Sequence, residues 1–514
     1  MEVLSTMLTF IPLSFLCLFL GLCFMILKGK SIGNSNYAPC KGTVFNQLLH
    51  FKKLHDYHTE LAKTNPTFRL LTPDQSELYT VDTRNVEHIL KTKFDKYSKG
   101  KYNQDVLSDL FGEGIFAVDG EKWRQQRKLA SYEFSTRVLR DFSCSVFRRN
   151  ASKLVRVLSE FSHRGVAFDL QDLLMRSALD SICEVGFGTE LNCLEESSKE
   201  GVEFMKAFDE SNALIYWRYV DPFWKIKRFL NIGSEATLKK KIKLMDDFVH
   251  GVIKARKAQL AVQQEESSNV KEDILSRFLM ESKKDPKTMT DKYLRDIIMN
   301  FMLAGKDSSA NTLTWFFYML CKNPLLQEKI AQEVRDNVTC YSSHEGEENI
   351  DEFVSNLTDD TIDKMHYLHA ALTETLRLYP AVPLDAKICF ADDILPDGYN
   401  VNKGDMVSYQ PYAMGRMKFI WGDDAEEFRP ERWLDHNGIF QPDSPFRFTA
   451  FQAGPRICLG KEFAYRQMKI FSAVLLGCFR FELSDETKVV TYKTMINLHI
   501  DGGLEVKAFH RDWD

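Results

Sequence analysis

The chain carries, at residues 451–460, the stretch Phe451-Gln-Ala-Gly-Pro-Arg-Ile-Cys458-Leu-Gly460. It places one cysteine in a loop punctuated by glycine and proline. The residues that follow, Lys461 to Gly477, are largely apolar and predict a helix. A thiol just before a helix N-terminus lies near unpaired N–H groups and the positive end of the helix dipole, so we expect its thiolate form to be favoured.

Such a thiolate can serve as the axial ligand of a haem iron, to which it donates electron density. Gly454 and Gly460 would let the backbone pass close to a flat macrocycle and to the sulfur, because neither carries a Cβ atom. Arg456 lies two residues before the cysteine, within reach of a carboxylate such as a haem propionate. The alternative is a buried structural cysteine, the commonest role of a lone cysteine.

The spacing F-x-x-G-x-R-x-C-x-G resembles the signature of the cytochrome P450 family. The resemblance implies a haem b cofactor whose iron is bound by Cys458. It places Phe451, Arg456 and Gly460 among the residues that hold the cofactor. It also implies a monooxygenase that takes its electrons from NADPH through a reductase.

Composition limits the other possibilities. The chain has 514 residues, of which 44% are hydrophobic and 27% charged, as in a globular protein. A net charge of −5 gives no sign of a polyanion partner, so we expect no nucleic-acid binding. The 11 cysteines are scattered and odd in number, which indicates a reducing compartment rather than a disulfide framework.

The N-terminus predicts a membrane anchor. Leu8 to Leu27 contains no charged residue and is long enough to cross a bilayer as a helix. Lys28 and Lys30 follow it, which places the bulk of the chain in the cytosol. We therefore expect an anchor at 1–30, a linker at 31–41 and a catalytic domain at 42–514, held as a single-pass protein in the endoplasmic reticulum membrane. A cleaved signal peptide is the alternative.

The fold class follows from periodicity. Phe68 to Val81 alternates around a Pro-Asp turn, which is typical of strands, whereas most other periodic segments are helical. We therefore predict a mainly α fold with a minor β region, the cytochrome P450 fold that the resemblance implies.

A helix is predicted from Gly120 to Arg140, preceded by a loop at Gly100 to Phe116. Trp123 and Arg127 are four residues apart and share a helix face, where an indole N–H and a guanidinium can bind a carboxylate together. The pair resembles the second haem-propionate clamp of the family. A surface arginine lying over a half-buried tryptophan is the alternative.

The longest helical pattern runs from Asp291 to Lys322, with Thr290 as its N-cap. Its middle reads Ala304-Gly-Lys-Asp-Ser-Ser309, where glycine and hydroxyl residues favour a local bulge. Asp307 and Ser308 are the predicted proton relay for dioxygen chemistry, and Ala304 leaves room beside them. The segment resembles the family's A-G-x-D-T-T, with Ser308 in place of threonine.

A second helix is predicted from Asp359 to Tyr379, with Glu374 and Arg377 on one face. Together with the downstream Arg432, these residues resemble the family's Glu-Arg-Arg triad, which implies a buried charge network with a structural role. The prolines that bracket 380–383 exclude a helix there, and we expect Val382 and Leu384 to line the pocket.

Family-like motifs extend over nearly the whole chain from about residue 42 and are most similar to those of plant fatty-acid ω-hydroxylases. The implied reaction inserts one oxygen atom into a C–H bond of a long-chain fatty acid at or near its terminal methyl. Another lipophilic substrate, such as a terpenoid or sterol, is the first alternative. The others are a haem protein that binds ligands or transfers electrons without catalysis, and a membrane-anchored structural protein without haem.

Overall fold

The computed structural model describes residues 33–72, 76–135, 137–195, 198–265, 273–287, 289–338 and 347–511. The predicted anchor at Leu8 to Leu27 and the predicted Pro-Asp turn at 73–74 lie outside these ranges. Within the described ranges, no helix combines the length and the apolar character needed to cross a membrane.

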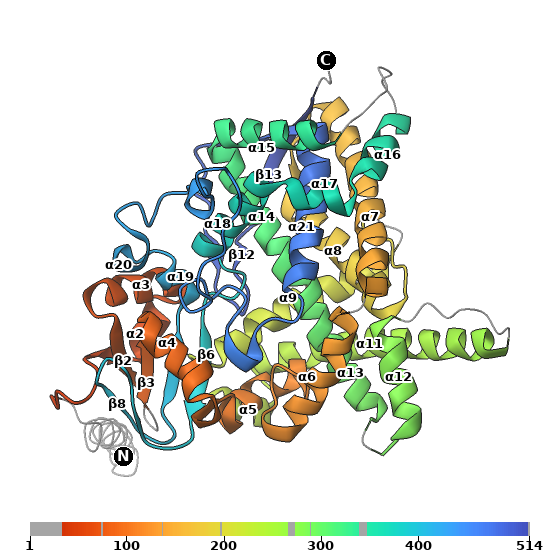
Figure 1. Ribbon diagram of the computed structural model, residues 1–514. Helices are drawn as coiled ribbons and strands as arrows, with labels where there is room; N and C mark the ends of the chain where they lie inside the picture. Colours follow the sequence, from red (N-terminus) through yellow and green to blue (C-terminus); the bar gives the residue numbers. More distant parts are fainter. Residues whose placement is uncertain are drawn as a thin grey trace, which may run out of the picture.

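Helices make up most of the described chain (Figure 1). Their bounds are α2 Val44–Leu49, α3 Leu54–Thr64, α4 Thr83–Glu87, α5 Gly100–Phe111, α6 Gly120–Ser135, α7 Arg137–Arg164, α8 Leu170–Phe187, α9 Lys199–Trp217, α10 Trp224–Leu230, α11 Gly233–Glu265, α12 Ile274–Lys284, α13 Asp291–Met302, α14 Ser308–Lys322, α15 Pro324–Asn337, α16 Glu347–Asn356, α17 Asp359–Lys364, α18 His366–Leu378, α19 Pro411–Met414, α20 Lys418–Trp421 and α21 Lys461–Cys478. The short 3₁₀ or π segments are η1 Phe51–Lys53, η2 His88–Thr92, η3 Phe94–Lys96, η4 Leu303–Asp307, η5 Pro430–Trp433 and η6 Gly454–Arg456.

The strands form one larger sheet and three small ones. The larger sheet has the order β1-β2-β3-β9-β6-β4, and Figure 1 shows it beside α2, α3 and α4, away from the main helical body. The strand bounds are β1 Cys40–Thr43, β2 Thr67–Leu71, β3 Ser76–Thr80, β4 Tyr97–Ser98, β5 Phe168–Asp169, β6 Asp385–Cys389, β7 Asp393–Ile394, β8 Asn400–Val401, β9 Met406–Tyr409, β10 Phe479–Leu483, β11 Tyr492–Lys493, β12 His499–Ile500 and β13 Glu505–His510. The mainly α fold with a minor β region is therefore confirmed.

The strands predicted between Phe68 and Val81 are β2 and β3, which pair antiparallel with Phe68 opposite Tyr79 and Leu70 opposite Glu77. Side chains alternate between the faces of a strand, so Glu77 and Tyr79 of β3 lie on one face together. β9 continues the sheet parallel to β3 and sets Met406 opposite Glu77. This face borders the cavity described below.

The core of the helical body forms where α21, α14, α8 and α7 pack together. Their inward side chains are almost completely buried, among them Leu154, Leu179, Phe316 and Leu475. Figure 1 shows α14 and α21 side by side in the middle of the molecule, with α7 outside them. The long helix and the helix after the cysteine are thereby fixed relative to each other, which positions the site between them.

The long helix is confirmed, and its predicted irregularity lies where glycine and hydroxyl residues cluster. Thr290 caps α13 by accepting from the Tyr293 N–H at 3.3 Å. The helix then widens into the π segment η4 from Leu303 to Asp307 and continues as α14. A π segment of this kind removes regular i to i−4 hydrogen bonds and is frequent at functional sites.

Two sequence predictions of element bounds are wrong. The loop predicted at Gly100 to Phe116 is mostly the helix α5, because the Asp119 carboxylate accepts from the N–H groups of Lys99 and Gly100 at 3.0 and 2.7 Å and so caps its start. The helix predicted from Asp359 to Tyr379 is broken at Met365. The carboxylate of Glu333, on another helix, accepts from the first N–H groups of α18 at 2.7 Å.

Candidate active site

Cys458 lies in the predicted loop, two residues before Gly460, the N-cap of α21, which begins at Lys461. Its backbone N–H donates to the Phe451 carbonyl at 2.8 Å, which closes the loop, and its sulfur accepts from the Gly460 N–H. Gly454 has a φ of +64°, and a Cβ there would lie 2.0 Å from the Leu90 carbonyl oxygen. Close packing on η2 therefore requires a glycine at 454.

The prediction of a favoured thiolate is wrong for the chain without a metal. The Cys458 side chain lines the cavity described below, and burial among the surrounding protein raises the pKa of its thiol. The Gly460 N–H, Arg127 and Lys461 lower this pKa, as the sequence suggested, but burial outweighs them. A bound metal cation deprotonates a coordinating thiol outright, so binding of the iron itself would have to produce the thiolate.

A cavity of about 340 Å³ lies between the Cys458 loop, α6, η4 and the larger sheet. Its walls include every predicted cofactor residue: Trp123, Arg127, Ala304, Phe451, Arg456 and Gly460. Ser308 lines it as well, as do Val382 and Leu384, which confirms the prediction for the extended segment after α18.

Trp123 joins the two arginines at the edge of this cavity. The Arg456 guanidinium lies 4.4 Å from the centre of its ring and that of Arg127 lies 5.9 Å away. Arg456 donates to the Asp119 carboxylate at 2.8 Å, but its buried Nε has no hydrogen-bond partner. Arg127 donates to the Ile457 carbonyl at 2.7 Å.

This set fits a haem group. An incoming carboxylate would satisfy the orphaned Arg456 Nε, and the adjacent Arg127 and Trp123 bring further donors toward the same edge. Cys458 offers a soft sulfur ligand on the wall that Gly460 also lines.

The π segment η4 and the first residue of α14 present Ala304, Gly305 and Ser308 to the cavity. The Ser308 hydroxyl donates to the Ala304 carbonyl one turn earlier at 2.5 Å. Asp307, by contrast, is not among the described residues that line the cavity. The two predicted relay residues therefore point in different directions, one into the site and the other into the protein.

Asp307 lies in a buried polar network that joins η4 to α9. Its carboxylate pairs with Lys306, and it also accepts from the Asn212 amide at 3.3 Å. Lys306 reaches Asp209 of α9 at 2.9 Å. Burial raises the pKa of Asp307 to about 6, against the lowering effect of Lys306. A carboxyl group with such a pKa can both hold and release a proton near neutral pH.

Sequence reasoning missed the partners of Asp307. Lys306 could have been suspected, because a lysine in the middle of a strongly apolar helix needs a nearby acid. Asp209 and Asn212 carry no local signal, since they come from a helix about a hundred residues earlier and only the fold brings them close.

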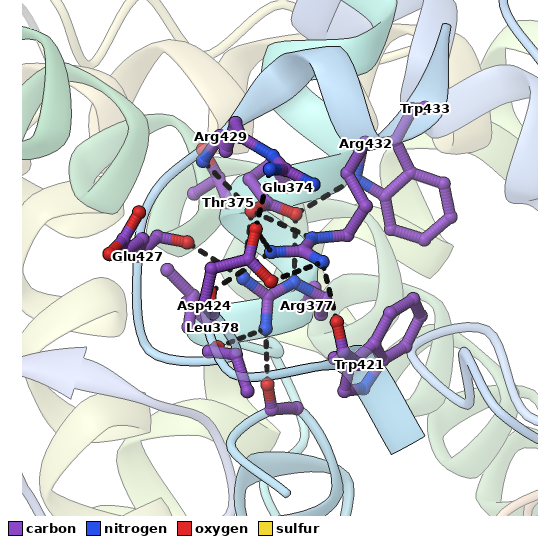
Figure 2. A network of polar contacts seen from close by, with 12 residues as sticks. Glu374, Thr375, Arg377, Leu378, Trp421, Asp424, Glu427, Arg429, Arg432 and Trp433 are labelled. Atoms are coloured by element: carbon purple, nitrogen blue, oxygen red, sulfur yellow. Dashed lines mark hydrogen bonds and ion pairs between the residues drawn. The ribbon is translucent and has the colours of Figure 1, made fainter. Parts of the chain in front are cut away.

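Glu374 organises a second buried network (Figure 2). Arg377 donates to both of its oxygens, at 2.8 and 2.7 Å, and Arg432 lies 3.5 Å away. The backbone N–H of Arg429 and the indole of Trp433 also donate to it, each at 2.9 Å. The structure therefore brings the three predicted triad residues together, and Trp433 adds a donor that the sequence had not indicated.

The sequence of this chain is similar to those of known proteins. The family model described as "Cytochrome P450" matches residues 35–503. "Cytochrome P450 704C1" from Pinus taeda is 51% identical over 483 residues, covering 92% of each chain. "Cytochrome P450 704B1" from Arabidopsis thaliana is 45% identical over 495 residues, covering 92% of this chain and 94% of its own. "Cytochrome P450 94B1" from Arabidopsis thaliana is 36% identical over 504 residues, covering 95% and 93%.

Proposed function

We propose that this chain, which belongs to the cytochrome P450 family, hydroxylates a long-chain fatty acid at or near the terminal methyl. Membership of the family makes it a monooxygenase with haem b and an NADPH-derived electron supply. The observation that carries this proposal is the single cavity that joins Cys458 and Ser308 to walls built largely from aromatic and aliphatic side chains. An aliphatic chain buries its CH₂ groups in such walls at a gain of roughly 0.8 kcal/mol each.

Each predicted site residue has a role in this proposal. Cys458 would hold the haem iron, while Trp123, Arg127 and Arg456 would hold the propionates, with Phe451, Gly460 and Ala304 packed around the group. Haem supplies the activation of dioxygen when it is bound. The chain supplies the protons and the exclusion of water.

For proton delivery, the Ser308 hydroxyl is the group that reaches the cavity, and it would donate there after turning away from the Ala304 carbonyl. Asp307 would store the proton behind it, within the Lys306 and Asn212 network. A relay between Asp307 and Ser308 then needs a side-chain rotation or a water molecule. Glu374, Arg377 and Arg432 would fix the scaffold on the cysteine side without taking part in the reaction.

The cellular setting is part of the proposal. An N-terminal anchor at 1–30 would hold the catalytic domain on the cytosolic face of the endoplasmic reticulum membrane, where NADPH–cytochrome P450 reductase would supply electrons. The charge pattern around Leu8 to Leu27 supports this orientation. Carbonate extraction of membranes tests the anchor: the full chain should stay in the pellet, whereas a chain lacking residues 1–30 should be released.

Turnover tests the substrate. The holoenzyme with reductase and NADPH should convert a panel of saturated fatty acids of twelve to twenty-two carbons, with mass spectrometry locating the new hydroxyl at or beside the terminal carbon. If sterols or terpenoids were hydroxylated and the fatty acids were not, the substrate would belong to one of those classes and the fatty-acid proposal would be wrong. Haem incorporation without turnover of any lipid would instead leave a ligand-binding or electron-transfer protein.

A further inference from the structure

The cavity ends, on the side of the larger sheet, in a small group of polar side chains. Glu77 and Tyr79 come from the same face of β3, Gln47 from α2 and His58 from α3, and all four line the cavity. Gln47 and Tyr79 each donate to Glu77 Oε2 at 2.7 Å. We call these four residues the polar end of the cavity.

His58 in the polar end lacks partners. Its side chain is 1% exposed, yet neither ring nitrogen has a hydrogen-bond partner. The ring packs against Tyr79 and Phe68 at centroid distances of 4.6 and 6.3 Å. Burial lowers the pKa of His58 to about 3, so the ring is neutral and offers one donor and one acceptor. An unsatisfied buried imidazole costs free energy, so a bound group that pairs with it would gain affinity.

The charges in the cavity are divided between its two ends. Of the described residues that line it, the cations are Lys99, Arg127 and Arg456, and all three lie toward Cys458. Lys99 pairs with Asp385 at 2.6 Å. The described lining of the polar end contributes a carboxylate, Glu77, and no cation. A carboxylate placed there would meet a like charge in a region of low dielectric constant.

We propose that the polar end binds the head group of the lipid substrate in an uncharged form, as a hydroxyl or a protonated carboxyl, and rejects a carboxylate. This inference rests on the proposed function, because it assumes that an aliphatic chain extends from the Cys458 end to the sheet. A hydroxyl matches the polar end well: it can donate to a nitrogen of His58 or to Glu77 and accept from the remaining N–H.

The proposal predicts that the affinity for a fatty acid depends on pH because the carboxyl group of the fatty acid itself titrates. Only the protonated fraction of the acid binds, so its apparent dissociation constant rises about tenfold per pH unit above a carboxyl pKa of roughly 4 to 5. A long-chain alcohol does not titrate, so its dissociation constant stays flat.

Apart from the Glu77 carboxylate, the titratable groups around the head group stay neutral over the test range. Burial raises the pKa of Tyr79 and of Tyr216, and the nearby charge of Glu77 raises both further. Burial also raises that of Tyr219 and lowers that of His55 to about 3. The Arg416 charge adds to the lowering of the His55 pKa, and its guanidinium lies 3.6 Å from the centre of the Tyr412 ring. The Asp56 carboxylate accepts from Tyr412 and Tyr492 at 2.8 and 3.1 Å. Between pH 6 and 8 these tyrosines and histidines therefore keep one protonation state, whereas a fatty acid changes its own.

The test is equilibrium dialysis of the full-length holoenzyme with dodecanoic acid and with 1-dodecanol at pH 6 and pH 8. We expect the dissociation constant of the acid to rise by up to about a hundredfold and that of the alcohol to change by less than about twofold. Glu77→Gln should remove most of the difference for the acid, and His58→Phe should weaken the alcohol by about fivefold, the value of one hydrogen bond. Leu54→Val, on the same wall, is the control and should leave the ratio unchanged.

An acid that binds equally at both pH values, or more tightly than the alcohol at pH 8, would overturn the proposal. This wild-type comparison stands even if Glu77→Gln fails to fold. Because binding is measured without turnover, the polar-end proposal and the proposed function can be refuted independently of each other. Binding with the expected contrast but without hydroxylation removes only the proposed function, and fatty-acid hydroxylation with pH-independent binding removes only the polar-end proposal.

Discussion

Replacing Glu374 by alanine tests the energetics of the buried network on the cysteine side. The Glu374 and Arg377 side chains are 0% and 1% exposed. Without Glu374, Arg377 keeps its hydrogen bonds to the carbonyl groups of Gly415, Ala425 and Glu427, but no carboxylate among the described residues pairs with its charge. Breaking a buried pair in this way costs about 3–5 kcal/mol of unfolding free energy.

The loss includes more than one interaction. The Arg429 N–H, the Arg432 guanidinium and the Trp433 indole also lose an acceptor. We therefore expect the upper part of that range, about 5 kcal/mol. Urea unfolding of the purified holoenzyme, followed by circular dichroism and by haem absorbance, measures the change. The double variant Glu374→Leu/Arg377→Met should lose less than the sum of its single variants, because it leaves no unpaired charge.

Glu281→Ala is the matched control. Glu281 also pairs with a cation three residues away, Lys284 at 2.9 Å, but these side chains are 39% and 73% exposed. Exposed pairs contribute about 0–1 kcal/mol, so the control should unfold almost like the wild type. If Glu374→Ala also loses less than about 1 kcal/mol, the network does not stabilise the fold and our reasoning about it is wrong.

Three further outcomes follow from other parts of the structure. Trp433→Phe should lose about 1.5–3 kcal/mol of unfolding free energy, the value of a hydrogen bond to a charged group, while product identity stays unchanged; an unchanged free energy would show that its 2.9 Å bond to Glu374 contributes nothing. His55 is 3% exposed, and burial lowers its pKa to about 3. In the unfolded chain a histidine has a pKa of about 6.5. As the pH falls below about 6.5, the unfolded chain therefore binds a proton at His55 that the folded chain does not bind, which favours unfolding. Acidification from pH 7.5 to 5 should therefore cost the wild type about 2 kcal/mol more than it costs His55→Phe, and equal losses in urea titrations would contradict this. Ser308→Ala should lower the product formed per NADPH oxidised by about tenfold, and Ser308→Thr should raise it above wild type because the extra methyl restricts the hydroxyl rotamers; unchanged coupling in both would exclude Ser308 from proton delivery.

Local patterns predicted the parts of the site that a short stretch of chain can encode. The loop around Cys458, the helix after it and the irregularity at 303–307 depend on residues near one another in sequence, and the structure has them where expected. The same holds for the Trp123 and Arg127 face of α6, since i and i+4 spacing fixes it.

The predictions failed where a distant segment decides the local outcome. Asp119 turns an expected loop into α5, and Glu333 breaks an expected helix at Met365. Asp307 faces away from the cavity because α9 supplies its partners. Burial reverses the expected direction of the Cys458 pKa, and burial is a property of the whole fold.

The polar end of the cavity could not have been predicted at all. Gln47, His58 and Glu77 belong to three separate elements, and nothing in the residues beside each of them indicates a ligand. Only the pairing of β3 with β9 and the packing of α3 over the sheet place these side chains at the same cavity as Cys458.

The most direct test of the whole account is the purified Cys458→Ser enzyme, assayed with reductase and NADPH beside the wild type. If the sulfur of this residue binds the haem iron, the variant forms no hydroxylated product and its reduced, carbon-monoxide-treated form lacks the red-shifted absorption band of a thiolate-ligated haem. Hydroxylation at the wild-type rate, or an unchanged band, would contradict the central claim.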